Sequence, residues 1–263
     1  MRTPFPVSDP VLAGRLSRPG YPRSNCYDPW WVVENRMGPH PLWLAESLSV
    51  LLPFEAGWRV LDLGCGKALT SIFMAHEFGV RVTAADLWVP ARDNQARIVA
   101  AGVEGFVEAA YAEAHALPFE PESFDAIVSF DAYHYFGTDD LYLNYLLRFL
   151  RPGGALGIVV PGLISDFTEV PEQLRTGWDP AFWSFHSPQW WRRHWEHSEA
   201  VDVLHADTVP DGWRLWLEWT RMCLDLNLPP LFPGSDGGAA EVGMLEADGG
   251  ANLGFTRVLA RRR

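Results

Sequence analysis

The stretch Val60-Leu61-Asp62-Leu63-Gly64-Cys65-Gly66-Lys67-Ala68 decides the fold of this chain. Residues 59–63 form a short apolar run that is typical of a buried strand, and residues 69–78 have the apolar spacing of a helix that ends at Gly79. Between them, the glycines at 64 and 66 allow the backbone to turn sharply and to approach a ligand closely. The stretch therefore predicts a strand, a nucleotide-binding loop and a helix.

The alternation of strand and helix continues along the chain. Further strands are predicted over 80–85, 106–109, 124–130 and 155–160, and helices over 93–101 and 139–150, the last with Thr138 as its N-cap. Such alternation is typical of a parallel sheet with helices on both faces. Residues 200–206 and 255–260 are predicted to add an antiparallel pair. The predicted fold class is α/β, a doubly wound, Rossmann-like sheet of seven strands.

The loop does not fit the two common phosphate-binding patterns. A dinucleotide-binding GxGxxG pattern requires a third glycine where Leu69 stands, and a P-loop requires Ser or Thr where Ala68 follows Lys67. Asp86, at the end of the second predicted strand, lies where a carboxylate can bind two ribose hydroxyls. The dinucleotide-binding pattern and the P-loop are therefore both rejected for this loop.

Five features in order resemble the class I S-adenosylmethionine-dependent methyltransferases over about residues 60–160. They are the loop 60–66, Asp86, Glu113-Ala114 ahead of Leu117-Pro118-Phe119, the strand 123–129, and the turn Arg151-Pro152-Gly153-Gly154. The resemblance implies S-adenosyl-L-methionine as cofactor and S-adenosyl-L-homocysteine as product. Residues 114–136 most resemble ubiquinone-biosynthesis-type and cyclopropane-synthase-related enzymes, which favours a carbon or oxygen acceptor.

The resemblance also implies which residues bind the cofactor. Asp62 would position the methionine part, Asp86 the ribose, and Glu113 with Ala114 the adenine amino group, with Leu87 beside the adenine. The expected cofactor-binding residues are Asp62, Gly64, Cys65, Gly66, Lys67, Asp86, Leu87, Glu113, Ala114, Phe130 and Tyr27. The chain departs from the family pattern twice, with Ala68 in place of a third glycine and Glu113 in place of an aspartate, which leaves the adenine contact open.

Lys67 is the only lysine of the chain, whereas arginine occurs 20 times among the 21 basic residues. An ammonium group is a compact point charge and a guanidinium is a broad planar fork, so the two are not equivalent in a tight loop. We hypothesise that Lys67 lies near the methionine carboxylate or closes the cofactor loop. The alternative is a solvated loop lysine.

The acceptor chemistry is expected beyond the carboxyl ends of the strands 124–130 and 155–160, next to the cofactor sulfur. Asp131, Tyr133, His134 and Tyr135 stand there as candidate catalytic residues, and an unperturbed histidine titrates in the range of a general base. The alternative is that these side chains only pack against the cofactor, because methyl transfer can proceed by proximity alone. No Asp/Asn-Pro-Pro-Tyr sequence is present, which disfavours a nucleobase target.

Tryptophan is concentrated after the core, with eight of the 13 Trp between residues 178 and 219. Residues 161–199 break the alternation and are predicted to form a helical aromatic cap, with one helix beginning at Ser187-Pro188. The candidate substrate-binding residues are His186, Trp190, Trp191 and Trp183. The alternative is that these rings pack the cap onto the sheet. No metal is expected, because the cap histidines lack a Cys or carboxylate partner at suitable spacing.

Charge and composition limit the partners. The net charge of −12 disfavours nucleic acid and anionic lipid. The three cysteines are far apart, the N-terminus has no apolar leader, and the apolar runs are too short to span a bilayer, so we expect a cytoplasmic protein without membrane insertion. The helix 211–226 is apolar on both sides, which indicates deep burial or a homodimer contact.

The predicted organisation has four parts. They are an N-terminal arm with helices over 1–52 that acts as a lid, a cofactor-binding core over 53–160, the cap over 161–199, and the C-terminal part of the core sheet over 200–263. The predicted function is methyl transfer from S-adenosylmethionine to a small, largely apolar or aromatic molecule by in-line displacement. The alternatives are a cofactor-binding sensor or partner subunit without catalysis, and a protein methyltransferase.

Overall fold

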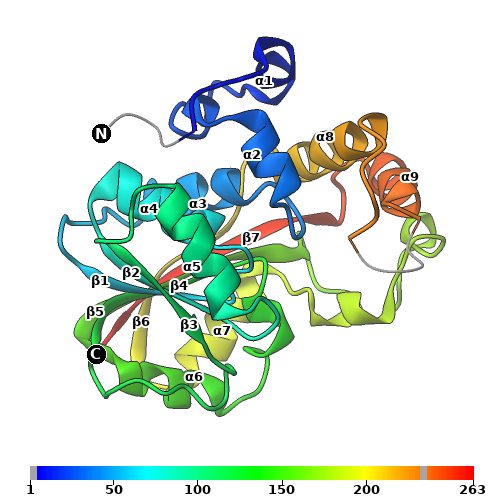
Figure 1. Ribbon diagram of the computed structural model, residues 1–263. Helices are drawn as coiled ribbons and strands as arrows, with labels where there is room; N and C mark the ends of the chain where they lie inside the picture. Colours follow the sequence, from blue (N-terminus) through cyan, green and yellow to red (C-terminus); the bar gives the residue numbers. More distant parts are fainter. Residues whose placement is uncertain (1–4, 232–235) are drawn as a thin grey trace.

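A seven-stranded sheet runs through the middle of the protein (Figure 1). The computed structural model describes residues 5–231 and 236–263. The strands lie in the order β3-β2-β1-β4-β5-β7-β6, and β7 is antiparallel to both of its neighbours. Their bounds are β1 Arg59–Leu63, β2 Arg81–Asp86, β3 Val107–Tyr111, β4 Phe124–Phe130, β5 Leu150–Leu163, β6 Val201–Thr208 and β7 Leu253–Arg262. The predicted α/β fold class and the antiparallel pair are confirmed.

Helices cover both faces of the sheet. One face carries α3 (Pro41–Ser49), α4 (Leu69–Phe78) and α5 (Ala91–Ala100), and the other carries α6 (Tyr142–Leu146) and α7 (Pro188–Glu196). The remaining helices are α1 (Pro10–Leu16), α2 (Pro29–Glu34), α8 (Gly212–Asp225) and α9 (Ala239–Asp248), of which α8 and α9 pack together at one end of the molecule (Figure 1). Among the described residues, no helix is both long and apolar enough to cross a bilayer.

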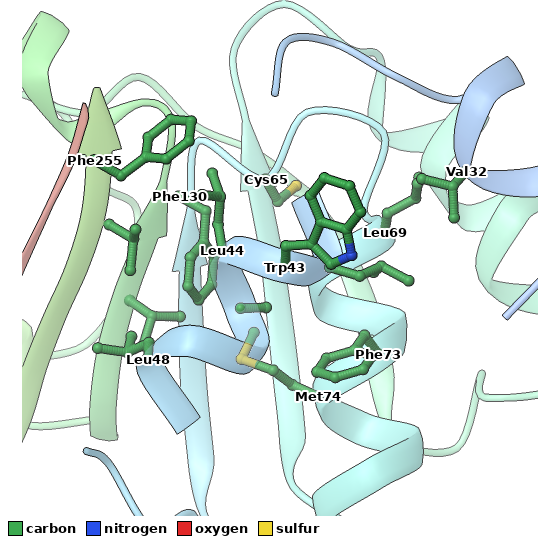
Figure 2. Packing of buried hydrophobic residues seen from close by; sticks show 14 of the residues in the cluster. Val32, Trp43, Leu44, Leu48, Cys65, Leu69, Phe73, Met74, Phe130 and Phe255 are labelled. Atoms are coloured by element: carbon green, nitrogen blue, oxygen red, sulfur yellow. The ribbon is translucent and has the colours of Figure 1, made fainter. Parts of the chain in front are cut away.

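The central strands are buried on both faces, which explains their continuous apolar sequence. In β1, Val60 points into the cluster with α3 and α4, whereas Leu61 and Leu63 point into the cluster with α6 and α7. Figure 2 shows side chains of the first cluster, among them Trp43 and Leu48 from α3 and residues of α4 and β4. Because the packing fixes the strands, their carboxyl ends meet at one edge of the sheet.

The segment between β4 and β5 differs from the prediction. The helix α6 is only half of the predicted 139–150, and Thr138 does not cap it; instead the Asp139 carboxylate accepts a hydrogen bond from the Leu141 backbone N–H at 2.8 Å. The Pro152-Gly153-Gly154 turn lies inside β5, because the strand continues through it with a shift of register against β4. A β-bulge absorbs the extra residues without ending the strand.

Two outer segments also differ. The N-terminal arm, predicted as a lid, packs on the core, since Leu12 and Leu16 of α1 are buried; its residues 1–4 lie outside the described part. The predicted helix through the first part of the cap is wrong as well, because residues 164–187 hold only two short 3₁₀ turns. The start of α7 is confirmed, with the Ser187 hydroxyl accepting a hydrogen bond from the Trp190 backbone N–H at 3.1 Å.

Candidate active site

A cavity of about 660 Å³ opens at the carboxyl ends of β1, β2 and β4. Most of the predicted cofactor residues line it, although they come from separate stretches of the chain. These lining residues are Gly64, Cys65, Gly66, Lys67, Asp86, Leu87, Glu113, Ala114 and Phe130. Parallel strands bring their carboxyl ends to a common edge, so residues that follow different strands share one space.

The glycines of the loop leave room that no other residue could leave. Gly64 has a φ of +75°, and a Cβ added to it would lie 2.5 Å from the Cβ of Ala132. The backbone N–H groups of Gly64 and Cys65 both donate to the Ala85 carbonyl, which ties the loop to β2. A side chain at Gly64 would therefore push the loop into the cavity, and the backbone is open to a ligand only with glycine there.

Ala68 stands where the related family has a glycine, and its φ is +61°. The left-handed conformation costs a non-glycine residue about 1–2 kcal/mol. The backbone thus keeps the shape that the third glycine normally provides, and the departure from the family pattern costs stability without changing the loop.

Asp86 joins the loop after β1 to the turn after β2. Its Oδ2 accepts a hydrogen bond from the Gly66 N–H at 2.8 Å, and its Oδ1 accepts from the Trp88 and Val89 N–H groups at 2.7 and 2.8 Å. Each carboxylate oxygen has a second lone pair with which it can accept from a hydroxyl. Asp86 is therefore placed to hold the loop and a ribose at once.

Asp62 does not line the cavity, because its side chain lies fully buried under the loop. Its Oδ2 accepts hydrogen bonds from the Thr70 and Ser71 hydroxyls, both at 2.6 Å, and its Oδ1 has no partner among the described residues. Burial raises the pKa of this carboxyl to about 6. Thr70 does line the cavity. Asp62 can therefore affect a ligand only indirectly, by orienting the Thr70 hydroxyl.

Lys67 links the loop to the N-terminal helices. Its Nζ donates to the carbonyl oxygen of Glu34, at the end of α2, at 3.2 Å. Burial lowers the pKa of Lys67, and the nearby charges of Arg97 and Arg36 lower it further. The side chain also lines the cavity, and its role in closing the loop or in binding the methionine carboxylate stays a prediction.

We expect Lys67→Arg to weaken binding of S-adenosylhomocysteine by roughly three- to tenfold, because a planar guanidinium cannot replace a compact ammonium at this carbonyl. Isothermal titration calorimetry measures the effect. Arg92→Lys, at an exposed arginine, is the control and should bind as the parent does. An unchanged affinity in Lys67→Arg would contradict the closing role.

Glu113, which was predicted to contact the adenine, is hydrogen-bonded to His115 in the structure. The Glu113 carboxylate accepts hydrogen bonds from the backbone N–H of His115 at 3.0 Å, and it lies 2.9 Å from the His115 Nδ1, and these contacts lower its pKa. Leu87 and the exposed Trp88 line the same end of the cavity. The sequence reasoning missed Trp88, which its position two residues after Asp86 could have indicated.

Three of the four candidate catalytic residues line the cavity: Asp131, His134 and Tyr135. Tyr133 does not, because its ring is buried between the sheet and the rings of Trp191 and Trp195. Asp131 follows β4 directly and has a φ of +54°, and burial raises the pKa of its carboxyl well above the usual range.

His134 is neutral in this site. Its side chain is 1% exposed, burial lowers its pKa to about 3, and its Nδ1 has no hydrogen-bond partner among the described residues. The expectation that it titrates near neutrality is wrong, because no carboxylate compensates its desolvation. A neutral imidazole is a weak base, but its free nitrogen can still accept or donate one hydrogen bond.

The predicted aromatic substrate wall does not line the cavity. Trp190 stacks between the rings of His186 and His194, at centroid distances of 3.7 and 4.5 Å, and Trp191 is buried against the sheet. Trp183 is half exposed and packs on Trp178. These four rings therefore pack the cap, which is the alternative that the sequence left open.

Tyr27 also lies away from the cavity. Its hydroxyl donates to the Glu77 Oε1 at 3.0 Å and lies 3.2 Å from the His76 Nδ1, while its ring packs on Phe73. Tyr27, which was expected to bind the cofactor, is instead part of the hydrophobic core next to α4.

Other residues complete the lining of the cavity, and the sequence did not single them out. They come from the α2–α3 loop, the cap, α8 and α9, and include Met37, Gly38, Phe182, Phe185, Trp216, Trp219, Cys223, Leu228 and Glu241. We call these residues with Asp131, His134 and Tyr135 the acceptor end. The apolar pattern on both sides of α8 was visible, but the sequence did not reveal which side faced a cavity.

Comparison with known proteins agrees with this geometry. Residues 60–154 match the methyltransferase domain family. The chain is 34% identical over 130 residues to 27-O-demethylrifamycin SV methyltransferase of Amycolatopsis mediterranei, covering 49% of this chain and 45% of that protein. It is 33% identical over 134 residues to the ubiquinone biosynthesis O-methyltransferase of Pseudomonas putida, covering 48% and 54%. The chain thus spans about half the length of the curated relatives it matches.

Solved structures share the fold. Phosphoethanolamine N-methyltransferase 2 of Haemonchus contortus superposes with a TM-score of 0.69 at 21% identity, covering 98% of this chain and 61% of that one. A SAM-dependent methyltransferase of Thiobacillus denitrificans superposes with a TM-score of 0.60 at 20% identity, covering 89% and 98%. The chain thus has the fold of the class I S-adenosylmethionine-dependent methyltransferases, and its residues 60–154 match a methyltransferase domain.

Proposed function

We propose that this protein transfers the methyl group of S-adenosylmethionine to a small, largely apolar or aromatic molecule. The observation that carries the proposal is the shared cavity, in which the loop of Gly64 and Gly66 faces the same space as Asp131 and His134. Two curated relatives are named for methyl transfer in rifamycin and ubiquinone biosynthesis, which supports a small-molecule acceptor and favours oxygen or carbon.

The cofactor, when bound, supplies an electrophilic methyl group on a sulfonium ion. The chain's own contribution is positioning: the loop of Gly64 and Gly66 and the Asp86 carboxylate hold one partner, and the acceptor end holds the other. Phe185 and Trp216 give that end apolar lining. The His134 Nδ1 can accept a hydrogen bond from an acceptor hydroxyl, but its low pKa makes alignment rather than strong base catalysis the main contribution.

Two measurements test the proposal. Calorimetry should detect binding of S-adenosylhomocysteine, and incubation with methyl-labelled S-adenosylmethionine and a metabolite extract should give labelled small-molecule product above a Gly64→Arg control. No binding at millimolar ligand would overturn the proposal. Binding without any labelled product would favour the alternative, a sensor or partner subunit that uses the same fold. Label in protein instead would favour a protein methyltransferase.

A further inference from the structure

The acceptor end carries four carboxyl groups without basic partners. They are Asp131, Asp179, Asp236 and Glu241, and within the described residues none of them forms an ion pair. One arginine and one lysine line the cavity, and both donate to backbone oxygens instead. Arg36 donates to the carbonyl of Pro229, and Lys67 donates to the carbonyl of Glu34. The carboxyl groups are therefore not neutralised by the chain itself.

Asp131 is the most exceptional of the four. Its side chain is partly buried and lines the cavity, and no hydrogen bond to its carboxyl is formed by the described residues. The glycine at position 38 gives it space, since a Cβ there would lie 2.1 Å from the Asp131 Oδ2. The Gly38 carbonyl accepts a hydrogen bond from the Trp219 indole N–H of α8, the helix that also holds Glu241, so Asp131 and Glu241 face the same cavity from neighbouring elements. Burial and the charge of Glu241 both raise the pKa of Asp131.

Glu241 is held in a fixed orientation. Its carboxylate accepts hydrogen bonds from the Trp216 indole N–H and from the Thr220 hydroxyl, both of α8, and burial raises its pKa. Trp216 makes an edge contact with Phe185, which in turn makes an edge contact with His134, at centroid distances of 6.2 and 5.3 Å. The two carboxyl groups thus share a cavity whose lining includes the aromatic rings of Phe185 and Trp216.

His134 gives an independent indication that this end binds a polar group. Its side chain is 1% exposed and lines the cavity, and its Nδ1 has no partner among the described residues. A buried ring nitrogen without a partner costs free energy in the protein alone. A bound molecule that forms a hydrogen bond with the His134 Nδ1 removes this free-energy cost.

We infer that the acceptor end binds a substrate that carries an ammonium group, held between Asp131 and Glu241 beside the aromatic lining. The inference rests on the proposed function and specifies its substrate class as an apolar or aromatic amine. A cation between two partly buried carboxyls favours their ionised forms, and aromatic faces attract cations as well. An anionic group would meet like charge here, and the net charge of −12 steers cations toward the protein.

The test compares amines with alcohols of the same shape. The protein is first saturated with S-adenosylhomocysteine and then titrated with tyramine against tyrosol, and with tryptamine against tryptophol. We expect the amine of each pair to bind at least about tenfold more tightly, because only the amine carries the charge. Equal affinities within both pairs, or no amine binding, would overturn the inference.

Matched variants locate the charge. Asp131→Asn keeps the shape of the side chain and should reduce the preference for amine to roughly threefold or less, with a smaller reduction in Glu241→Gln. Asp140→Asn removes the same formal charge at a carboxylate that is 97% exposed, and it should keep the preference. An unchanged preference in both Asp131→Asn and Glu241→Gln would also overturn the inference.

The first step of the titration separates the two proposals. If S-adenosylhomocysteine does not bind the parent protein, the proposed function fails. If it binds and the amines show no preference, only the ammonium site fails. Binding of S-adenosylhomocysteine to each variant also shows that the variant is folded.

Discussion

Gly64→Val should lower the affinity for S-adenosylhomocysteine by at least about a hundredfold. The residue has a φ of +75°, and its first side-chain carbon would lie 2.5 Å from the Ala132 Cβ. Either the loop or the segment after β4 must then move. Both movements fill the space in which a bound ligand would contact the backbone of the loop. Calorimetry of the purified variant measures the loss.

Gly57→Val is the matched control for backbone strain. Gly57 has a φ of +86°, so valine is strained there as well, but nothing lies within 4 Å of an added Cβ and the residue is outside the cavity. We expect Gly57→Val to destabilise the fold less than Gly64→Val, which adds a steric clash to the same backbone strain, and to bind within roughly threefold of the parent. If both variants bind as the parent does, the loop is not the cofactor site.

Asp62→Asn should make the folded protein more stable at pH 8. Burial raises the pKa of Asp62 to about 6 from 3.8, so keeping it ionised at pH 8 costs the folded state about 3 kcal/mol. An asparagine avoids this cost, although its unpaired amide reduces the gain by about 1 kcal/mol. A net gain of about 2 kcal/mol in the free energy of unfolding is expected.

The pH dependence gives the sign of the effect. A raised folded pKa means that the carboxyl contributes stability below pH 3.8 and that the contribution is lost as the pH rises through 6. The advantage of Asp62→Asn should therefore be largest at pH 8 and shrink toward pH 4, as urea unfolding would show. A variant less stable than the parent at pH 8 would contradict the assignment.

The same substitution should weaken S-adenosylhomocysteine binding by roughly tenfold. The Asp62 carboxylate accepts from the hydroxyls of Thr70 and Ser71, and Thr70 lines the cavity, so an amide disturbs the orientation of that hydroxyl. Thr83→Ala, which removes a buried hydroxyl from β2 that bonds only Glu108, is a control for binding. If Asp62→Asn is more stable than the parent but binds S-adenosylhomocysteine more weakly, Asp62 serves ligand binding at a cost in stability.

The core and its cofactor loop could be predicted because their signals are local. The run 59–63 reads as a strand from its own residues, and Gly64 and Gly66 permit the turn by themselves. The position of Asp86 follows from the end of a strand, and the sheet then brings these residues together by topology alone.

The acceptor end could not be predicted because it depends on contacts between distant segments. Trp190 and Trp216 look alike in sequence, but one stacks between histidines on the outer face of α7 and the other lines the cavity. The pKa of His134 likewise depends on the rings and backbone around it, not on its neighbours in sequence. Composition correctly indicated an aromatic C-terminal half, and only tertiary packing selects the rings that face a ligand.

The roof of the cavity has a consequence for biosynthesis. Its α2–α3 loop is fastened by the Trp219 indole N–H to the Gly38 carbonyl and by the Arg36 guanidinium to the Pro229 carbonyl, across 181 and 193 residues of chain. These contacts cannot form until the ribosome has made the chain as far as Pro229. A nascent chain would therefore expose an open, acidic, aromatic surface, and its closure would be among the final steps of maturation.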